Sequence, residues 1–179
     1  PVIEQDNDFS GGSLSLDNST LDIKGIATFD HTDALINHGS TAKINNLLDY
    51  GSKIYVVNDS KLEIEGAMLE DTSLIVKNNS NTTINGMLTV VDSGTIEFVD
   101  GEFAVNDGGI KIDKSNLDVA GEANFLSSDT ELDSSNANFK DKLTLIDSAM
   151  LLKNGSSLSV GGVADLTVSA LVVQNGSKV

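Results

Sequence analysis

A small residue recurs at nearly regular intervals along the chain, and this repeat constrains the fold more than any other feature of the sequence. It occurs nine times, at Ser19, Ser40, Ser60, Ser80, Gly101, Ser115, Ser135, Ser156 and Ser177. The steps between these marker residues are 21, 20, 20, 21, 14, 20, 21 and 21 residues. Repeats of roughly 20 to 50 residues are typical of proteins that stack equivalent supersecondary units. We therefore expect one structural unit about every 20 residues.

Each marker residue is expected to lie between a turn and a short strand. Two places before it, every repeat except that of Gly101 has Asn, Asp or His, at Asp17, His38, Asn58, Asn78, Asp113, Asp133, Asn154 and Asn175. Asn and Asp tolerate left-handed backbone and bond to their own backbone across turns, which predicts a corner. Four places after the marker the residue is always apolar, at Ile23, Ile44, Ile64, Ile84, Val105, Val119, Phe139 and Val160. The alternation of apolar and polar residues there predicts a strand with one buried face.

Two more alternating segments complete each repeat, so that a unit holds three short strands. A second bend is predicted six places after the marker, at Gly25, Asn46, Gly66, Gly86, Asp107, Gly121, Asp141 and Gly162. The inward pairs expected after this bend are Ala27/Phe29, Leu48/Tyr50, Leu88/Val90, Ala123/Phe125, Leu143/Leu145 and Ala164/Leu166. Those expected before the next marker are Leu14/Leu16, Ala34/Ile36, Ile54/Val56, Leu74/Val76, Ile96/Phe98, Ile110/Ile112, Met150/Leu152 and Leu171/Val173.

These units predict an all-β fold, a parallel β-solenoid of about eight coils. Strands of four or five residues bury too little surface as isolated hairpins, whereas stacked coils pair each strand with its equivalent in the next coil, about 4.8 Å away. Ile23, Ile44, Ile64 and Ile84 are expected to form one inward column. An antiparallel sandwich also has short strands and frequent turns, but it does not require one corner residue every 20 residues. A helical fold conflicts with the period of two.

The 14-residue step from Gly101 to Ser115 departs from the period. One interpretation is a shortened coil near residues 101–115, in which Asn106-Asp107-Gly108-Gly109 bridges one side. The alternative is a local hairpin that interrupts the stack. In either case residues 1–179 are expected to form a single solenoid segment, and its end within a repeat suggests a fragment of a longer protein.

Composition excludes several classes of partner and chemistry. The chain has 27 acidic residues, 11 basic residues that are all lysine, and a formal net charge of −16. Such a surface repels nucleic acid and anionic lipid, and it lacks the guanidinium that binds phosphate in a bidentate manner. There is no cysteine for disulfides or thiolate metal sites. No stretch approaches the roughly 18 apolar residues of a membrane span, so no direct membrane insertion is expected.

The repeat resembles the passenger regions of bacterial autotransporter adhesins, of the self-associating and pertactin-like kinds. The resemblance rests on the unit apolar-x-apolar-x-Asn-x-Ser-x-apolar-x-Ile-x-Gly, clearest in residues 54–66, 74–86 and 150–162, and it extends from about Ser13 to Val179. A similar unit occurs in filamentous haemagglutinin-like proteins. The resemblance implies a right-handed three-stranded parallel β-helix, export across a Gram-negative envelope, and adhesion or aggregation. It implies no individual binding residues, because these proteins share a scaffold and not a site motif.

No residue set predicts a catalytic, cofactor or metal site. His31 and His38 lack an accompanying acidic ligand set with metal spacing, and His38 occupies a corner position. Asp107-Gly108-Gly109 and Gly161-Gly162 lack the rest of the Gly-Gly-x-Gly-x-Asp calcium motif, and Asp129, Asp133 and Glu70-Asp71 are expected on solvated surface. Asn-x-Ser/Thr triplets occur at Asn18, Asn58, Asn78, Asn81, Asn154 and Asn175, and most of them follow from the corner motif itself. Thr82 and Thr83 are too few for a threonine ladder.

The predicted function is that of a segment of an extracellular bacterial surface adhesin, not an enzyme. Its expected partners are like molecules, as in a homo-oligomer, or host surface ligands and glycans, bound through many weak polar contacts along a stiff rod. Two alternatives remain open at this point. One is a carbohydrate-active β-helix of the pectate-lyase kind, which would gather carboxylates in a groove; the other is a passive spacer.

Overall fold

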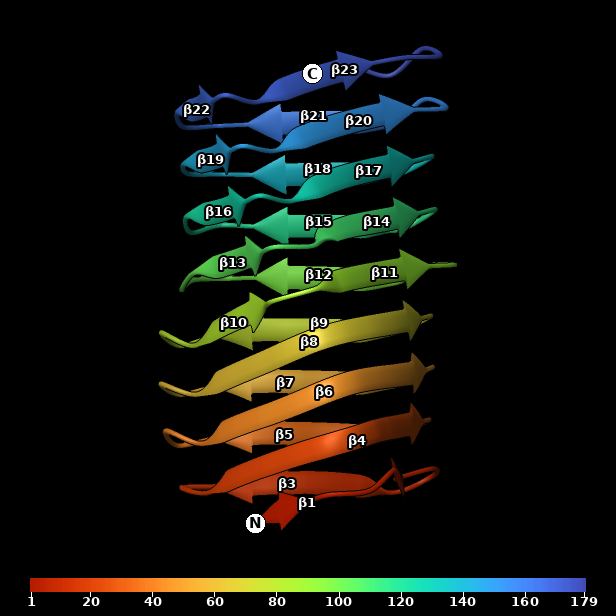
Figure 1. The fold of residues 1–179 in the computed structure, drawn as a ribbon, viewed down its shortest axis with the longest axis vertical. Helices are drawn as coiled ribbons and strands as arrows, with labels where there is room; N and C mark the ends of the chain where they lie inside the picture. Colours follow the sequence, from red (N-terminus) through yellow and green to blue (C-terminus); the bar gives the residue numbers. More distant parts are fainter.

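The computed structural model describes all 179 residues as a single stack of parallel strands (Figure 1). It contains 23 strands and no helix, and every strand pair is parallel. One sheet has 15 strands and the other has eight. The chain winds through about nine turns, which confirms the predicted β-solenoid and is close to the expected eight coils.

The strands form three faces that meet at three edges. Face 1 consists of β3 (Ser13–Asp17), β5 (Asp33–Asn37), β7 (Lys53–Val57), β9 (Ser73–Lys77), β12 (Thr95–Phe98), β15 (Asn116–Val119), β18 (Asn136–Phe139) and β21 (Ser157–Val160). Three long strands then cover faces 2 and 3 together: β4 (Thr20–Asp30), β6 (Thr41–Tyr50) and β8 (Lys61–Glu70). The short strands β1 (Val2–Ile3) and β2 (Asn7–Asp8) pair with β4.

After β8, faces 2 and 3 are built from separate strands. Face 2 continues with β10 (Asn81–Ile84), β13 (Phe103–Asn106), β16 (Ala123–Leu126), β19 (Leu143–Ile146) and β22 (Ala164–Thr167). Face 3 continues with β11 (Met87–Val91), β14 (Gly109–Asp113), β17 (Asp129–Asp133), β20 (Ala149–Lys153) and β23 (Ala170–Val173). We name the edges by the faces that they join: edge 1–2, edge 2–3 and edge 3–1.

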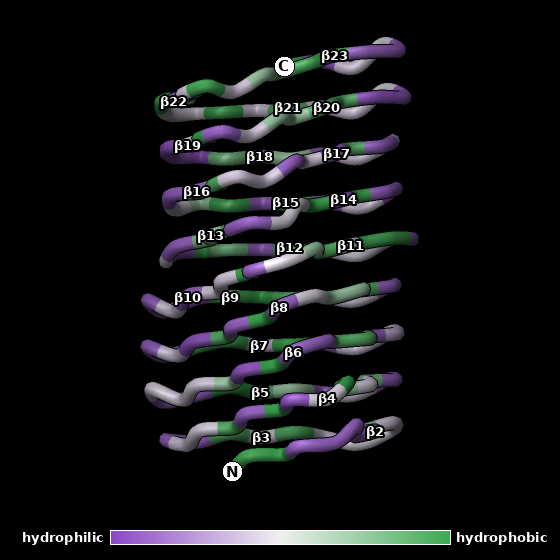
Figure 2. Tube along the Cα trace, viewed as in Figure 1, coloured by the Kyte–Doolittle hydropathy of each residue, from purple (hydrophilic) through white to green (hydrophobic).

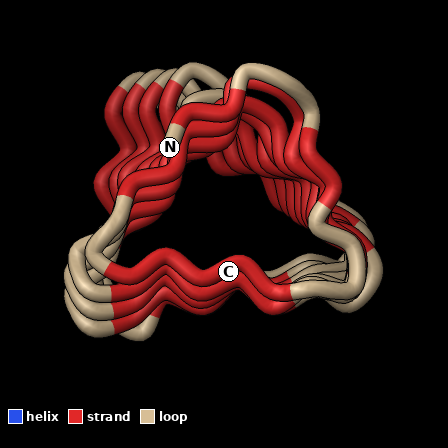
Figure 3. The backbone as a smooth tube through the Cα atoms, turned by 90° about the horizontal axis from the view of Figure 1, so that it is seen from below, coloured by secondary structure: helices blue, strands red, loops and turns tan.

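The cross-section is a triangle with strands on its sides and loops at its corners (Figure 3). In Figure 1 the near strands β4, β6 and β8 rise from left to right, and the face 1 strands return behind them, so the coil is right-handed. Hydrophobic and hydrophilic residues alternate along the strands (Figure 2), which places the apolar ones inside. A single core of 39 buried apolar residues results.

The predicted isoleucine column is confirmed. Ile23 pairs with Ile44, Ile44 with Ile64, and Ile64 with Ile84 on face 2. Each of these side chains is at most 4% exposed. The column continues through Val105, Phe125 and Leu145, in register.

The shortened coil predicted near 101–115 is wrong, because the stack keeps full coils through this region. Thr82 pairs with Phe103, Leu88 with Ile110, and Ile96 with Leu117, so the coil length stays at 21 or 22 residues. A hairpin is excluded because these pairs are all parallel. The 14-residue step arises because the markers up to Gly101 lie on edge 1–2, whereas those from Ser115 onward lie on edge 3–1. The residue equivalent to Ser115 in the preceding coil is therefore Gly94 and not Gly101. The backbone amide of Gly94 donates a hydrogen bond to the Ser115 hydroxyl.

The same change of edge displaces all three predicted sets of inward residues. Ile110/Ile112, Met150/Leu152 and Leu171/Val173, predicted beside Ile96/Phe98, lie on face 3. Val119, Phe139 and Val160 continue the face 1 column of Val76 and Phe98, not the isoleucine column. Ala123/Phe125, Leu143/Leu145 and Ala164/Leu166 lie on face 2, although the sequence pattern assigned them to the segment after the second bend.

The inward pair predicted in β6 is also wrong. Leu47 and Asp49 point into the core, whereas Leu48 and Tyr50 are only partly buried. The register between β4 and β6 shifts between Ile23 and Ile26, so β4 holds one residue more at its bend than β6 does. A one-residue difference moves the whole alternation to the opposite face. Asp49 therefore takes the core position that Phe29 and Leu69 take in the adjacent coils.

Candidate functional site

Anything that binds along this rod meets the outward residues of its faces and edges, because the apolar side chains fill the interior. Several outward rows consist of polar side chains joined from coil to coil. Along edge 1–2, the Asn58 side-chain amide donates to Asn37 at 2.7 Å, and that of Asn78 donates to Asn58 at 2.8 Å. On face 1, Asn136 donates to Asn116 at 3.1 Å, and Ser157 donates to Asn136 at 2.6 Å. Such rows hold like groups at the spacing of the coils.

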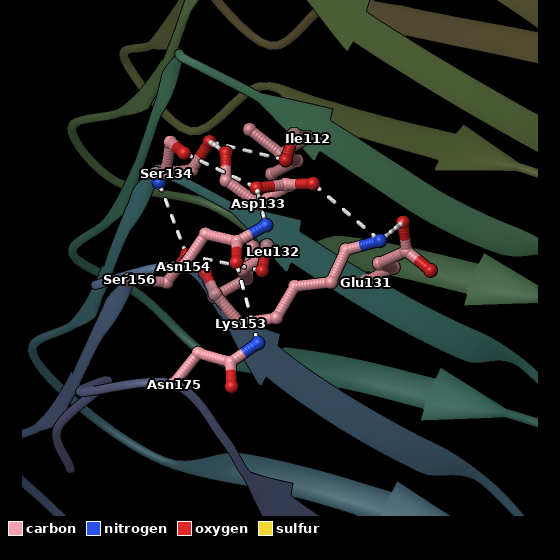
Figure 4. Close-up of polar contacts among 10 residues, drawn as sticks. Ile112, Glu131, Leu132, Asp133, Ser134, Lys153, Asn154, Ser156 and Asn175 are labelled. Atoms are coloured by element: carbon pink, nitrogen blue, oxygen red, sulfur yellow. Dashed lines mark hydrogen bonds and ion pairs between the residues drawn. The ribbon is translucent and has the colours of Figure 1, made fainter.

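The densest polar cluster lies on edge 3–1 near the C-terminus (Figure 4). The Lys153 ammonium lies 2.8 Å from a Glu131 carboxylate oxygen and 3.4 Å from one of Asp133. Asn154 donates to the other Asp133 oxygen at 2.8 Å, and Asn175 donates to Asn154 at 3.3 Å. The hydrogen bond from Asn154 lowers the pKa of Asp133, and the contact with Glu131 raises the pKa of Lys153. Asp133 and Lys153 are therefore held in their ionised forms at neutral pH.

Serine hydroxyls under this cluster are buried and bond to the backbone of the corner. The Ser135 hydroxyl donates to the carbonyls of Asp133 at 2.6 Å and Ile112 at 3.0 Å. It accepts the amide of Ser115 at 3.2 Å, while the amide of Ser135 donates to the Ser156 hydroxyl at 3.1 Å. Each hydroxyl thus ties its own turn to the neighbouring coils, and its burial requires those bonds.

A shallow groove lies on face 3 beside the polar cluster. Met87, Thr89, Lys111, Glu131 and Leu151 are among the residues that line it. In the outward row Gly109 stands between Met87 and Asp129, and a Cβ at Gly109 would lie 2.3 Å from the carbonyl oxygen of Asp129, so the two coils approach closely there. The groove combines apolar walls with one ammonium and two carboxylates, from Asp129 and Glu131.

The two histidines lie on different edges, so the structure does not bring them together. His31 is in the edge 3–1 turn before β5, where it bonds to Asp30. His38 is in the edge 1–2 turn after β5, 2.5 Å from Asp17. Both residues have left-handed backbone, with φ of 50°. No group of three or more His, Asp and Glu side chains is arranged to hold a metal ion.

The predicted corner role of the asparagine triplets is confirmed for five of the six. Asn18, Asn58, Asn78, Asn154 and Asn175 have positive φ, between 47° and 57°. Asn81 instead begins β10. Thr82 points into the core and Thr83 outward, so they do not form a ladder.

Sequence reasoning missed Asp49, the one acidic residue that is completely buried. Burial raises the pKa of Asp49 to about 6, although the Ser52 and Thr72 hydroxyls act to lower it. The signal that could have found it is the single residue by which the bend of β4 is longer than that of β6.

No known family model matches the chain, and neither the curated proteins nor the solved structures yield a match. The structure has no helix that could cross a membrane.

Proposed function

We propose that the chain is a segment of an extracellular bacterial surface adhesin that binds like molecules or host surface ligands through its outward polar rows. The observation that carries this proposal is the coil-to-coil continuity of those rows, as in Asn116, Asn136 and Ser157. Side-chain amides and hydroxyls at a constant spacing offer the same weak contact several times. Multiple weak contacts on one stiff body give an avidity far above that of a single contact.

Charge shapes how such a rod would associate. A net charge of −16 makes like molecules repel one another, and salt screens this repulsion over about 10 Å at 0.1 M. Self-association through the polar rows should therefore strengthen as ionic strength rises toward physiological values. Binding to a neutral glycan should depend much less on salt.

The test displays the chain on beads and measures both bead clustering and attachment to host cell layers. Asn116→Ala/Asn136→Ala removes two amides from the face 1 row. The control, Thr41→Ala/Thr83→Ala, removes two outward hydroxyls of face 2 that join no coil-to-coil row. We expect the face 1 variant to lose most clustering or attachment and the control to retain it. Beads carrying the unaltered chain that neither cluster nor attach would contradict the proposal and would favour a passive spacer.

A carbohydrate-active role is a second candidate, favoured by the face 3 groove. Its carboxylates, from Asp129 and Glu131, lie beside Lys111, and carboxylates in a groove are the groups that glycan-cleaving enzymes use. Incubation with neutral and acidic polysaccharides tests this role directly. Depolymerisation that Glu131→Gln abolishes would support it, and unchanged polymer length would dismiss it.

A further inference from the structure

Asp49 is an ionisable residue at a core position that apolar residues occupy in the adjacent coils. Its side chain is 0% exposed, and neither carboxylate oxygen has a hydrogen-bond partner. In register it lies between Phe29 of β4 and Leu69 of β8, which fill the same inward column. A buried polar group without partners is costly, and a buried charge more so.

The strands packed around Asp49 direct no charged side chain toward its carboxylate. The inward residues of the adjacent strands are all apolar; they are Leu21, Ile23, Ala27, Phe29, Ala34, Ile36, Ala42, Ile44, Leu47, Ile54, Val56, Leu62, Ile64, Ala67, Leu69, Leu74 and Val76. The charged residues of these strands alternate with them and point outward; they are Asp22, Lys24, Asp30, Asp33, Lys43, Lys53, Lys61, Glu63, Glu65, Glu70 and Lys77. No charged side chain is among the causes that shift the pKa of Asp49.

Two nearby hydroxyls and the backbone amides of Ser52 and Tyr50 only partly relieve the site. Ser52 and Thr72, on edge 3–1, act to lower the pKa of Asp49. Their hydroxyls are directed at backbone carbonyls, that of Ser52 at Tyr50 at 3.4 Å and that of Thr72 at Glu70 at 3.0 Å. Neither completes a hydrogen bond to the carboxylate.

We propose that Asp49 is a pH-sensitive weak point in the N-terminal part of the rod, where ionisation of its carboxyl group loosens the coil containing β6 and protonation tightens it. In the unfolded chain an aspartate has its ordinary pKa of 3.8, whereas in the fold it is raised to about 6. The folded state therefore binds the proton more tightly. Its stability is lowest above pH 6 and rises as the pH falls from 6 toward 4. This inference does not depend on the proposed function.

The experiment measures urea unfolding of the whole chain between pH 4.5 and 7.5. Asp49→Asn removes the charge at nearly constant shape, and Asp49→Leu restores the residue type of the neighbouring coil. Asp33→Asn is the matched control, because it removes one exposed acidic charge from an adjacent strand. We expect Asp49→Asn to lower the unfolding constant about 100-fold at pH 7.5 and less than about tenfold at pH 4.5, since each pKa unit is worth a factor of ten. The control should follow the unaltered chain.

Hydrogen exchange, corrected for its intrinsic pH dependence, locates the effect. At pH 7.5, Asp49→Asn should increase protection in β4, β6 and β8 more than in β17 and β20, because solenoid coils open locally. An unchanged unfolding constant at pH 7.5, or a destabilisation at that pH by both Asp49 variants, would overturn the proposal. Failure of both variants to fold would also overturn it, because the carboxylate would then be a required part of the core.

Discussion

The N-terminal and C-terminal parts of the rod make the same triangle with sharp turns at different edges. Up to Gly101, positive φ occurs at edge 1–2, as at Asn58 and Asn78, while edge 2–3 is only a bend within β4, β6 and β8. From Asp107 onward, edge 2–3 has the positive φ and edge 1–2 has none. Edge 3–1 keeps a left-handed turn throughout. A coil of this size thus needs two sharp turns, and the third edge can be a gentle bend.

The two parts also differ in what fills the core. The C-terminal part contains a stack of aromatic rings, with centroids 5.9 Å apart between Phe103 and Phe125 and 6.0 Å apart between Phe125 and Phe139. The N-terminal part has mainly aliphatic columns, one aromatic pair of Phe9 and Phe29, and one buried carboxylate, Asp49. We infer that the C-terminal coils are the more stable half of the rod.

Among the substitutions that test this difference between the two parts, Phe125→Ala is expected to have the largest effect on the free energy of unfolding. Phe125 is 1% exposed and contacts rings on both sides, so its truncation should cost about 3 to 5 kcal/mol in urea unfolding. The matched N-terminal variant Phe29→Ala removes the same ring from a position with one ring partner, Phe9, and should cost the lower end of that range, about 3 kcal/mol. Equal losses from the two variants would contradict a special role for the aromatic stack.

Gly101 is the last residue of edge 1–2 with a positive φ, and Gly101→Ala tests how much stability depends on the sharp turn there. Gly101 has φ of 86°, and a Cβ there would lie 1.9 Å from the carbonyl oxygen of Ser80. We expect a loss of more than about 2 kcal/mol from clash and left-handed strain together. The control is Gly155→Ala, with φ of 79° and open space around the added atom, which should cost only about 1 to 2 kcal/mol. A smaller loss of stability from Gly101→Ala than from Gly155→Ala would mean that the backbone at Gly101 does not approach Ser80 so closely.

Two serine-to-alanine substitutions compare a buried hydroxyl on edge 3–1 with one on edge 1–2. Ser135→Ala removes a buried hydroxyl that bonds to two carbonyls and accepts one amide, so it should cost about 1 to 3 kcal/mol. The hydroxyl of Ser60, on edge 1–2, is buried without a partner of its own. Ser60→Ala should therefore change the free energy of unfolding by less than about 0.5 kcal/mol. A larger loss from Ser60→Ala than from Ser135→Ala would mean that the Ser135 hydroxyl does not form its three hydrogen bonds.

Val168→Asn is expected to stabilise the chain slightly. Val168 has φ of 51° at edge 2–3, where the preceding coils place Asp107, Ser127 and Asp147. A β-branched residue is strained in this conformation, whereas asparagine tolerates it, so the gain should be about 1 kcal/mol. Thermal unfolding at matched protein concentration measures it, and a loss on substitution would argue against a left-handed turn there.

Much of the fold follows from the sequence because a repeated strand pattern and a repeated turn residue support each other. The isoleucine column could be predicted for that reason. The location of the later turns could not, because Asn-x-Ser and Asp-x-Ser motifs mark a type of turn and not a particular edge. Asp49 was missed because the extra residue of β4 appears in the marker spacing only as a step of 21 instead of 20 residues, which does not say where in the coil it lies. Its place at the bend decides which side chains of β6 point inward.

The most direct test of constant coil length uses engineered cysteine pairs in a chain that has no native cysteine. Glu97 and Asp118 are outward partners on adjacent strands of face 1, at the spacing of about 4.8 Å that lies within reach of a disulfide. We predict that Glu97→Cys/Asp118→Cys oxidises to an intramolecular disulfide, seen by mass and by mobility without reductant. A shortened coil would instead pair Asp118 with Ala104, so efficient oxidation of Ala104→Cys/Asp118→Cys, with none in the first variant, would contradict the account.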